Sequence, residues 1–166
     1  MCETHQGFIC ANAGIDASNG PHGHVVLLPL DADRSARHIQ TALSAAAGGR
    51  VGVVITDTHG RAFRKAIINV AIGIAGFDAV VDHRGGFDRE GRMLVATEQA
   101  LGDELAAAAG ILMDKGGGYP VVLVRGVDTQ PAPGTVDDLV RAEEHGLFRT
   151  CLLYTSPSPR DRTSSR

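Results

Sequence analysis

The clearest structural signal in the sequence is VGVVITDT, at residues 51–58. The β-branched run that starts at Val51 is typical of a strand covered on both faces. Polar residues follow directly, and we expect the strand to end at Thr56, Asp57 and Thr58. This strand is the predicted centre of the fold.

Two helices are predicted, one before and one after this strand. The first is headed by Asp33, carries apolar residues at helical spacing and ends at a pair of glycines. The second has Thr97 as its cap and runs over residues 98–113, where three glycines end it. We expect its acidic residues Asp103 and Glu104 to face solvent. Its predicted apolar stripe consists of Leu101, Leu105, Ala108 and Leu112.

Shorter elements complete the pattern. They are strands over residues 7–12, 25–30 and 119–126, the last one begun by Pro120, and a helical piece over 136–144. The segment NVAIGIAG, at 69–76, is compatible with a strand or a helix, because its glycines disfavour a long helix and its length is too short for a period to decide. This alternation predicts a mixed sheet with flanking helices.

Composition limits the class of protein. The chain has 166 residues, 43% of them hydrophobic and 21% charged, which predicts one folded domain. Its net charge is −3 and no basic stripe alternates with aromatic residues, so we expect no nucleic-acid partner. No apolar run reaches the roughly 18–20 residues of a membrane span, and the first residues lack a signal pattern. We therefore expect a cytoplasmic protein without a membrane partner.

Both ends of the chain differ from the middle. The last stretch, TCLLYTSPSPRDRTSSR at 150–166, replaces Ala, Gly and Val by Ser, Pro and Arg. We interpret it as a non-homologous, artefactual and disordered tail, which leaves one domain over residues 1–149. The first strand begins almost at once, and we expect that an upstream part of this domain is missing.

Two predicted strands end in an aspartate, Asp16 and Asp57, and Thr58 follows the second. Carboxyl ends of strands commonly hold ligands, and two carboxylates with a threonine oxygen suit Mg²⁺ or Mn²⁺ beside a phosphate. The alternative is that these residues only form turns, Asp16 with Asn19 in DASNG and Asp57 in TDTHG. On spacing alone, the turn interpretation is preferred.

Two further segments have residues suited to phosphate. The loop MDKGGGYP, at 113–120, offers backbone N–H groups and a lysine, but it follows a helix and lacks P-loop spacing, so a helix cap and turn is preferred. The segment GRAFRK brings Arg61, Arg64 and Lys65 close together, where they either bind phosphate or solvate a loop; the solvated loop is the default.

Several motifs occur in a fixed order: ETHQGFICANAGIDASN, VITDTHGRAFR, NVAIGIAGFDAVVDHRG, GRMLVATEQALGDELAAAAGILM and PVVLVRG. Together they resemble the coenzyme F-420:L-glutamate ligase family, also described as coenzyme F-420-0 gamma-glutamyl ligases. The resemblance runs from about Glu3 to Arg149. It implies an α+β fold of two related subdomains, an intertwined homodimer, and a GTP-dependent enzyme that adds L-glutamate to the side chain of the coenzyme F-420 precursor.

The resemblance also implies roles for individual residues. Asp16, Asp57 and Thr58 match ligands of Mn²⁺ or Mg²⁺, a monovalent cation such as K⁺ assists, and Asn19 matches a GTP contact. Reaction chemistry adds the hypothesis of an acyl-phosphate intermediate, since a carboxylate does not condense with an amine unaided. The expected nucleotide-binding segment consists of Met113, Asp114, Lys115, Gly116, Gly117, Gly118, Tyr119 and Pro120.

The sequence departs from the family pattern in two places. Family members usually read RxGQxN where this chain has RKAIIN, so Ala66 and Ile67 replace a glycine and a polar residue. The amino-terminal portion of the family domain is also expected to precede this chain, so we expect the fragment alone to be inactive. The alternative hypothesis is a noncatalytic metal- or nucleotide-binding fragment, or part of a longer fusion with a nitroreductase-like domain.

Overall fold

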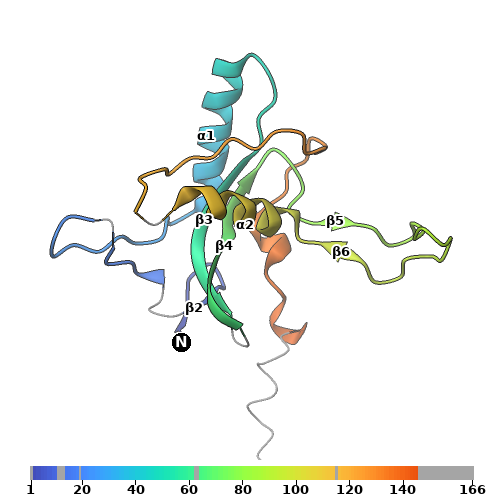
Figure 1. Ribbon diagram of the computed structural model, residues 1–166, viewed down its shortest axis with the longest axis horizontal. Coiled ribbons are helices and arrows are strands. Elements are labelled where there is room, and N and C mark those ends of the chain that lie inside the picture. The colour runs from blue at the N-terminus through green and yellow to red at the C-terminus, as the bar shows by residue number, and fades with distance from the viewer. Residues whose placement is uncertain (1, 11–13, 19, 62–63, 115, 146–166) are drawn as a thin grey trace, which may run out of the picture.

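The computed structural model describes residues 2–10, 14–18, 20–61, 64–114 and 116–145 (Figure 1). Its helices are α1 (Ala32–Ala47) and α2 (Leu101–Met113), with 3₁₀ turns η2 (Val136–Leu139) and η3 (Glu143–His145). Its strands are β1 (Cys2–Glu3), β2 (Ile9–Cys10), β3 (Val53–Arg61), β4 (Arg64–Ala75), β5 (Val81–Asp82) and β6 (Glu98–Gln99). The α+β class is thereby confirmed.

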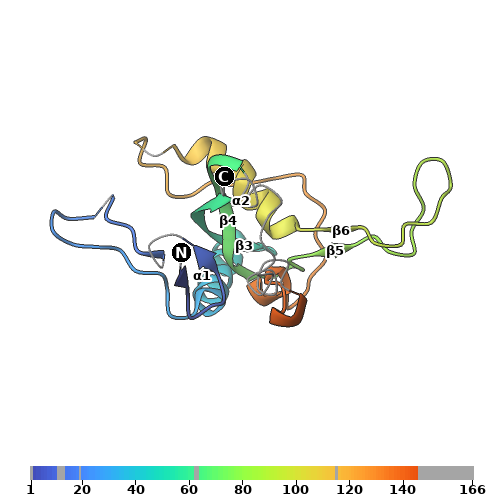
Figure 2. The ribbon, with the colours of Figure 1, turned by 90° about the horizontal axis from the view of Figure 1, so that it is seen from below.

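The described strands pair in three antiparallel couples, β1 with β2, β3 with β4, and β5 with β6. The expected single mixed sheet is replaced by these separate pairs. The β3–β4 pair is the long one, and both helices pack against it. Gly73 of β4 lies against Ala32 of α1, whereas Ala71 and Ile74 lie against Gly102 of α2. Figure 2 shows β3 and β4 between the two helices.

The central strand extends beyond its predicted end. The sequence predicted that it ends at Thr56, Asp57 and Thr58, but β3 continues to Arg61, so Asp57 and Thr58 lie inside a strand rather than in a turn. Pairing explains the difference, because Asp57 faces Val70 of β4 within a regular stretch of the ladder that runs from Thr56 to Gly60. The ambiguous segment 69–76 is therefore a strand over nearly all its length.

Both helices start at different residues from those predicted. The cap of α1 is Asp31, whose Oδ1 accepts a hydrogen bond from the Arg34 N–H at 2.7 Å, and Asp33 lies in the first turn instead. Gly48 ends this helix in the left-handed conformation, as predicted. Helix α2 begins after β6, so Thr97 does not cap it. Its buried stripe is Gly102, Ala106 and Ala109, with Leu101 and Leu105 half-buried and Leu112 exposed.

Two predicted strands are not formed. Residues 25–30 contribute only one isolated bridge, between Val26 and Asp16, and residues 119–126 form no strand. Val121 and Leu123 are 80% and 70% exposed. An apolar β-branched run forms a strand only where another strand pairs with it, and neither segment has such a partner among the described residues. The helical piece at 136–144 is two separate 3₁₀ turns.

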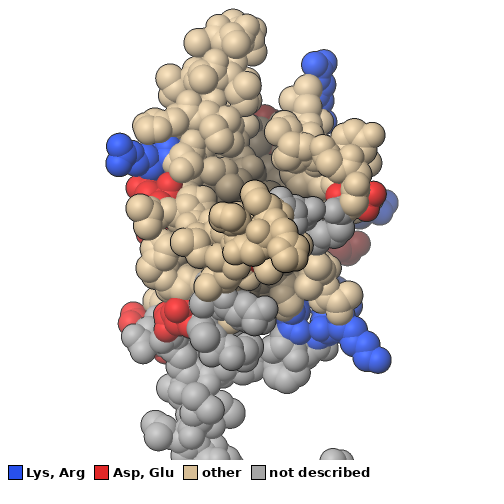
Figure 3. All heavy atoms as spheres, turned by 90° about the vertical axis from the view of Figure 1, so that its left-hand side faces the viewer, with Lys and Arg blue, Asp and Glu red and all other residues tan. Residues whose placement is uncertain are grey.

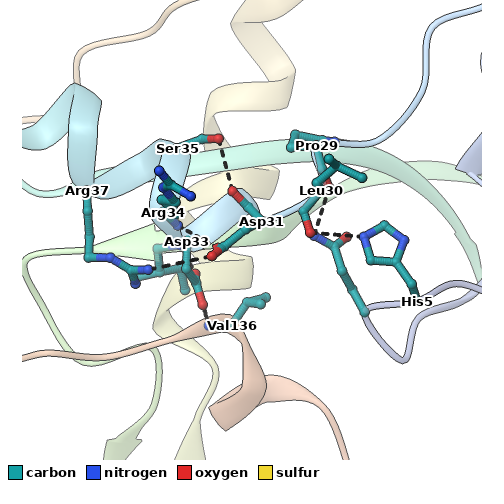
Figure 4. Close-up of polar contacts among 11 residues, drawn as sticks. His5, Pro29, Leu30, Asp31, Asp33, Arg34, Ser35, Arg37 and Val136 are labelled. Atoms are coloured by element: carbon teal, nitrogen blue, oxygen red, sulfur yellow. Dashed lines mark hydrogen bonds and ion pairs between the residues drawn. The ribbon is translucent and has the colours of Figure 1, made fainter.

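The outer edge of β4 is covered by two aspartates. Asp33 of α1 accepts a hydrogen bond from the Ile74 N–H at 2.7 Å and from the Val136 N–H, and Figure 4 shows its carboxylate directed at Val136. Asp103 of α2 accepts from the Ala71 N–H at 2.9 Å, so the prediction that it faces solvent was wrong. Such contacts stop an exposed edge from pairing with another strand.

The core lies between β4 and α2. Its buried residues are Ala71, Ile74, Phe77, Ala79 and Ala106, with Val54, Leu101, Leu105 and Leu139 packed around them. Most are small, which lets the helix approach the strand closely. None of the helices in the described part of the chain has the length and apolar character needed to cross a membrane.

Candidate functional site

Asp57 and Thr58 lie side by side in the middle of β3, and both are half-buried. Asp57 Oδ1 accepts a hydrogen bond from the Thr58 N–H at 2.7 Å. No salt bridge among the described residues includes Asp57. Carboxylate oxygens are ligands that hard divalent cations prefer, so Asp57 is a candidate metal ligand.

The end of α2 is attached to the same part of β3. The Asn69 side-chain amide lies 3.5 Å from Met113 Sδ and 3.4 Å from Thr56 Oγ1, and it donates to both. Asn69 is the strand partner of Thr58, so its contact with Met113 brings the end of α2 to the same part of the β3–β4 pair as Thr58. Asn69 was not among the predicted site residues, although it is the one polar side chain in NVAIGIAG.

Gly110 allows this attachment. A Cβ atom at Gly110 would lie 2.9 Å from Asn69 Cγ, closer than real Cβ contacts allow. Helix α2 therefore needs glycine here to approach β4 while Asn69 keeps its contacts.

The predicted nucleotide segment begins where α2 ends. Asp114 has φ +31° and Gly118 has φ +69°, so the chain turns sharply after Met113, as the helix-cap interpretation predicts. The Gly117 N–H donates to the Asp114 carbonyl at 3.4 Å. Residues 116–120 are exposed, and Lys115 lies outside the described residues. The segment is thus accessible from solvent, and its root is held against β3 and β4.

Asp16 lies on a different part of the molecule. It is exposed, and its Oδ1 accepts from the Ser18 N–H and the Ser18 hydroxyl, each at 2.7 Å, which is a turn of the kind the alternative interpretation predicted. The described residues of its loop, 14–18 and 20–28, extend away from the β3–β4 pair in both ribbon views (Figures 1 and 2). Figure 3 shows that the face on this side has few charged side chains near its centre. Asn19 lies outside the described residues.

The donor types fit a hard divalent cation, since two carboxylates and a hydroxyl supply oxygen atoms only. Asp57 and Thr58 are adjacent, whereas Asp16 is on the projecting loop. Within the described ranges, no three His, Cys, Asp or Glu side chains are grouped so that they could hold a metal ion. The described structure thus does not bring the three expected ligands together.

A charged cluster lies elsewhere, at the base of the β5–β6 pair. Asp82 and Glu98 face each other across the two strands, and Arg84 contacts both, with Nη2 at 2.6 Å from Asp82 Oδ2 and 3.2 Å from Glu98 Oε1. Hydrogen bonds from Arg84 lower the pKa of Asp82 to about 2. The same contacts raise the pKa of Arg84. An open hollow of about 310 Å³ is lined by Glu98, residues 138–142 and His145, and none of these is a predicted site residue.

Comparisons with known proteins agree on one family. The family model described as F420-0:Gamma-glutamyl ligase matches residues 1–126. A coenzyme F420:L-glutamate ligase of Archaeoglobus fulgidus is 45% identical over 147 residues, covering 88% of this chain and 59% of the relative. Ligases of the same name from Methanopyrus kandleri and Methanocaldococcus jannaschii are each 43% identical, covering 90% of this chain and 61% and 60% of the relatives. The chain thus spans about three-fifths of the length of these relatives.

Proposed function

The chain belongs to the F420-0:gamma-glutamyl ligase family, and from that membership we propose that it joins L-glutamate to the side chain of a coenzyme F420 precursor by an amide bond, at the expense of GTP. The observation that carries the proposal is that Asp57 and Thr58 lie in β3, the strand to which Asn69 attaches the end of α2. All three lie in the region that the family model matches.

The reaction needs an activated carboxyl group. A carboxylate is a poor acceptor for an amine, because its oxygen is a poor leaving group. In the proposed reaction, a carboxylate oxygen of the precursor attacks the γ-phosphorus of GTP, which releases GDP and leaves an acyl phosphate. The glutamate amine then attacks the acyl carbon, the C–N bond forms, the C–O bond to phosphate breaks, and the amine loses a proton.

We assign the chain's own residues to this reaction as follows. Asp16, Asp57 and Thr58 would hold Mn²⁺ or Mg²⁺, with a monovalent cation such as K⁺ assisting. The divalent ion would supply neutralisation of charge on the phosphate oxygens. Asn19 and the segment 113–120 would contact GTP. The hydrogen bonds of Asn69 to Met113 and Thr56 support this assignment, because they attach the start of the segment to the strand that carries Asp57 and Thr58.

The proposed assembly is a homodimer of the longer protein.

Mass spectrometry tests the activity directly, because addition of glutamate increases the precursor mass by one glutamyl residue. The assay contains GTP, Mn²⁺, K⁺, L-glutamate and precursor, and compares this chain alone with the chain extended by the remaining segment of the Archaeoglobus relative. We expect GTP-dependent addition by the extended protein. Absence of addition by both proteins would contradict the proposal.

Hydroxylamine tests the intermediate. In place of glutamate, it attacks an acyl phosphate and gives a stable hydroxamate. We expect a hydroxamate only when GTP and precursor are both present. A protein that transfers glutamate but never yields a GTP-dependent hydroxamate would rule out the acyl phosphate and leave the ligase assignment standing.

A further inference from the structure

Three cations gather at the free end of the β3–β4 pair. Arg61 ends β3, Arg64 begins β4, and the two are direct partners across the strands. Lys65 follows immediately. Within the described part of the chain, no salt bridge includes any of the three. Like charges directly opposite each other destabilise a strand pair, so this arrangement has an electrostatic cost that no ion pair in the described ranges offsets.

The β5–β6 pair shows the contrast. There the like-charged partners Asp82 and Glu98 also face each other, but Arg84 lies between them and contacts both carboxylates. Among the described residues, one like-charged pair therefore has a counter-ion of its own and the other has none.

The local geometry holds the three cations together. The Arg61 guanidinium donates to the Lys65 carbonyl at 3.3 Å, while its Nε is buried and has no hydrogen-bond acceptor. The strand register shifts between Gly60 and Arg61, which leaves Lys65 and Ala66 outside the regular pairing. Ala66 has φ +66°, a conformation that L-residues rarely adopt. Bulges of this type redirect side chains and are common near functional sites.

We propose that Arg61, Arg64 and Lys65 form an oxyanion site that binds a phosphate or carboxylate group of a substrate. Guanidinium groups bind such oxyanions through two parallel hydrogen bonds, and a bound anion would provide the missing counter-charge. Arg61 lies three residues beyond Thr58 on the same strand, about 10 Å at the usual rise of a strand. The identification of the anion as a substrate group rests on the proposed function; the existence of the site does not.

Titration calorimetry on the full chain at low salt tests the site with two probes. Inorganic tripolyphosphate represents the nucleotide phosphates, and γ-linked triglutamate represents the carboxylates of a glutamylated acceptor. The test variant is the double substitution R64Q/K65Q. Its matched control, R89Q/R92Q, removes the same charge from two exposed arginines of the loop between β5 and β6. R64K/K65R keeps the charge, and circular dichroism confirms that each variant folds.

We expect one probe to bind the unmodified chain, and R64Q/K65Q to weaken that binding by about tenfold or more. R89Q/R92Q should leave the affinity unchanged, and R64K/K65R should retain most of it. The probe that binds identifies the anion as nucleotide phosphate or acceptor carboxylate. The proposal is overturned if neither probe binds, or if both glutamine double variants lose affinity equally. Because no turnover is measured, failure of the ligase proposal leaves this result unaffected.

Discussion

The carboxylate of Asp33, in the first turn of α1, accepts a hydrogen bond from the backbone N–H of Ile74 in β4 at 2.7 Å. The same carboxylate accepts from the Val136 N–H, at 3.2 Å from Oδ2. One side chain thus connects a helix, a strand and the start of a 3₁₀ turn. Ile74 is fully buried, so its N–H has no access to water if this acceptor is removed.

Replacement of Asp33 should destabilise the fold. Asp33→Ala leaves the Ile74 and Val136 N–H groups without acceptors, and we expect the free energy of unfolding to fall by about 1–3 kcal/mol. Urea unfolding followed by circular dichroism measures this change. Asp137→Asn, at an exposed aspartate of η2, is the control and should have almost no effect. Equal stabilities of the two variants would show that the carboxylate does not secure the edge of β4.

Gly73 should not tolerate a side chain. A Cβ atom there would lie 2.5 Å from the backbone carbon of Ala32, so Gly73→Ala forces α1 away from β4. We expect a loss of about 1–3 kcal/mol in the free energy of unfolding. Gly49→Ala is the matched control, because no atom lies within 4 Å of the added Cβ. Equal midpoints of thermal unfolding for the two variants would show that α1 does not pack closely on β4 at Gly73.

Replacement of Ala66 by glycine should stabilise the fold. The φ of Ala66 is +66°, and this conformation costs an L-residue about 1–2 kcal/mol. A glycine avoids that cost, but it lowers the free energy of unfolding by about 0.4–1 kcal/mol because the unfolded chain gains conformational freedom. We therefore expect Ala66→Gly to raise the free energy of unfolding by about 0.5–1 kcal/mol, as measured in urea. Ala108→Gly, at an exposed position inside α2, is the control with the opposite expected sign. A destabilised Ala66→Gly variant would argue against the left-handed conformation.

The Asp82–Arg84 pair should be visible in an acid titration. The pKa of Asp82 is about 2 in the folded protein, below its ordinary value of 3.8. The pair therefore stabilises the fold above about pH 4, and this contribution disappears as the pH falls towards 2. Carboxyl carbon NMR should give a midpoint near 2 for Asp82, and Arg84→Gln should return it to near 3.8. Arg89→Gln should leave the midpoint unchanged. An ordinary midpoint in the unmodified protein would show that the ion pair does not persist in solution.

Asp57 provides the test of the metal assignment. Asp57→Asn keeps an oxygen that accepts from the Thr58 N–H, so the strand should remain intact. Loss of the negative charge should lower glutamate transfer by the extended protein by about 100-fold or more. The mass-spectrometric assay measures transfer, and Asp128→Asn, at an exposed aspartate, is the control. Full transfer by Asp57→Asn with an unchanged unfolding curve would remove Asp57 from the ligand set.

The sequence predicted local structure where local signals are sufficient. Gly48 ends α1 as expected, because the left-handed cap needs only a glycine after the last turn. The central strand was located correctly but its end was not, since its length depends on β4, which pairs with it up to Arg61. Helix starts were displaced for a similar reason: Asp33 resembles a cap in sequence, yet the strand edge takes its carboxylate and Asp31 forms the cap.

The roles of the candidate site residues stay predictions. The structure places Asp57 and Thr58 in the middle of β3, and the loop after α2 begins where Asn69 attaches Met113 to that strand. The sequence could not reveal Asn69 as the connecting side chain, because its contacts to Thr56 and Met113 join three separate elements. Nor could it show the opposition of Arg61 and Arg64, which depends on the register of the strand pair.

The two aspartates on the edge of β4 also set an order for biosynthesis. Residue 33 leaves the ribosome before β4 and can bond to it at once, but the acceptor for Ala71 is Asp103, which emerges some thirty residues later. Until then, that part of the nascent strand is open to pairing with any neighbouring polypeptide. A nascent chain that stalls after β4 and before α2 therefore leaves this edge of β4 uncovered, and an uncovered edge favours aggregation.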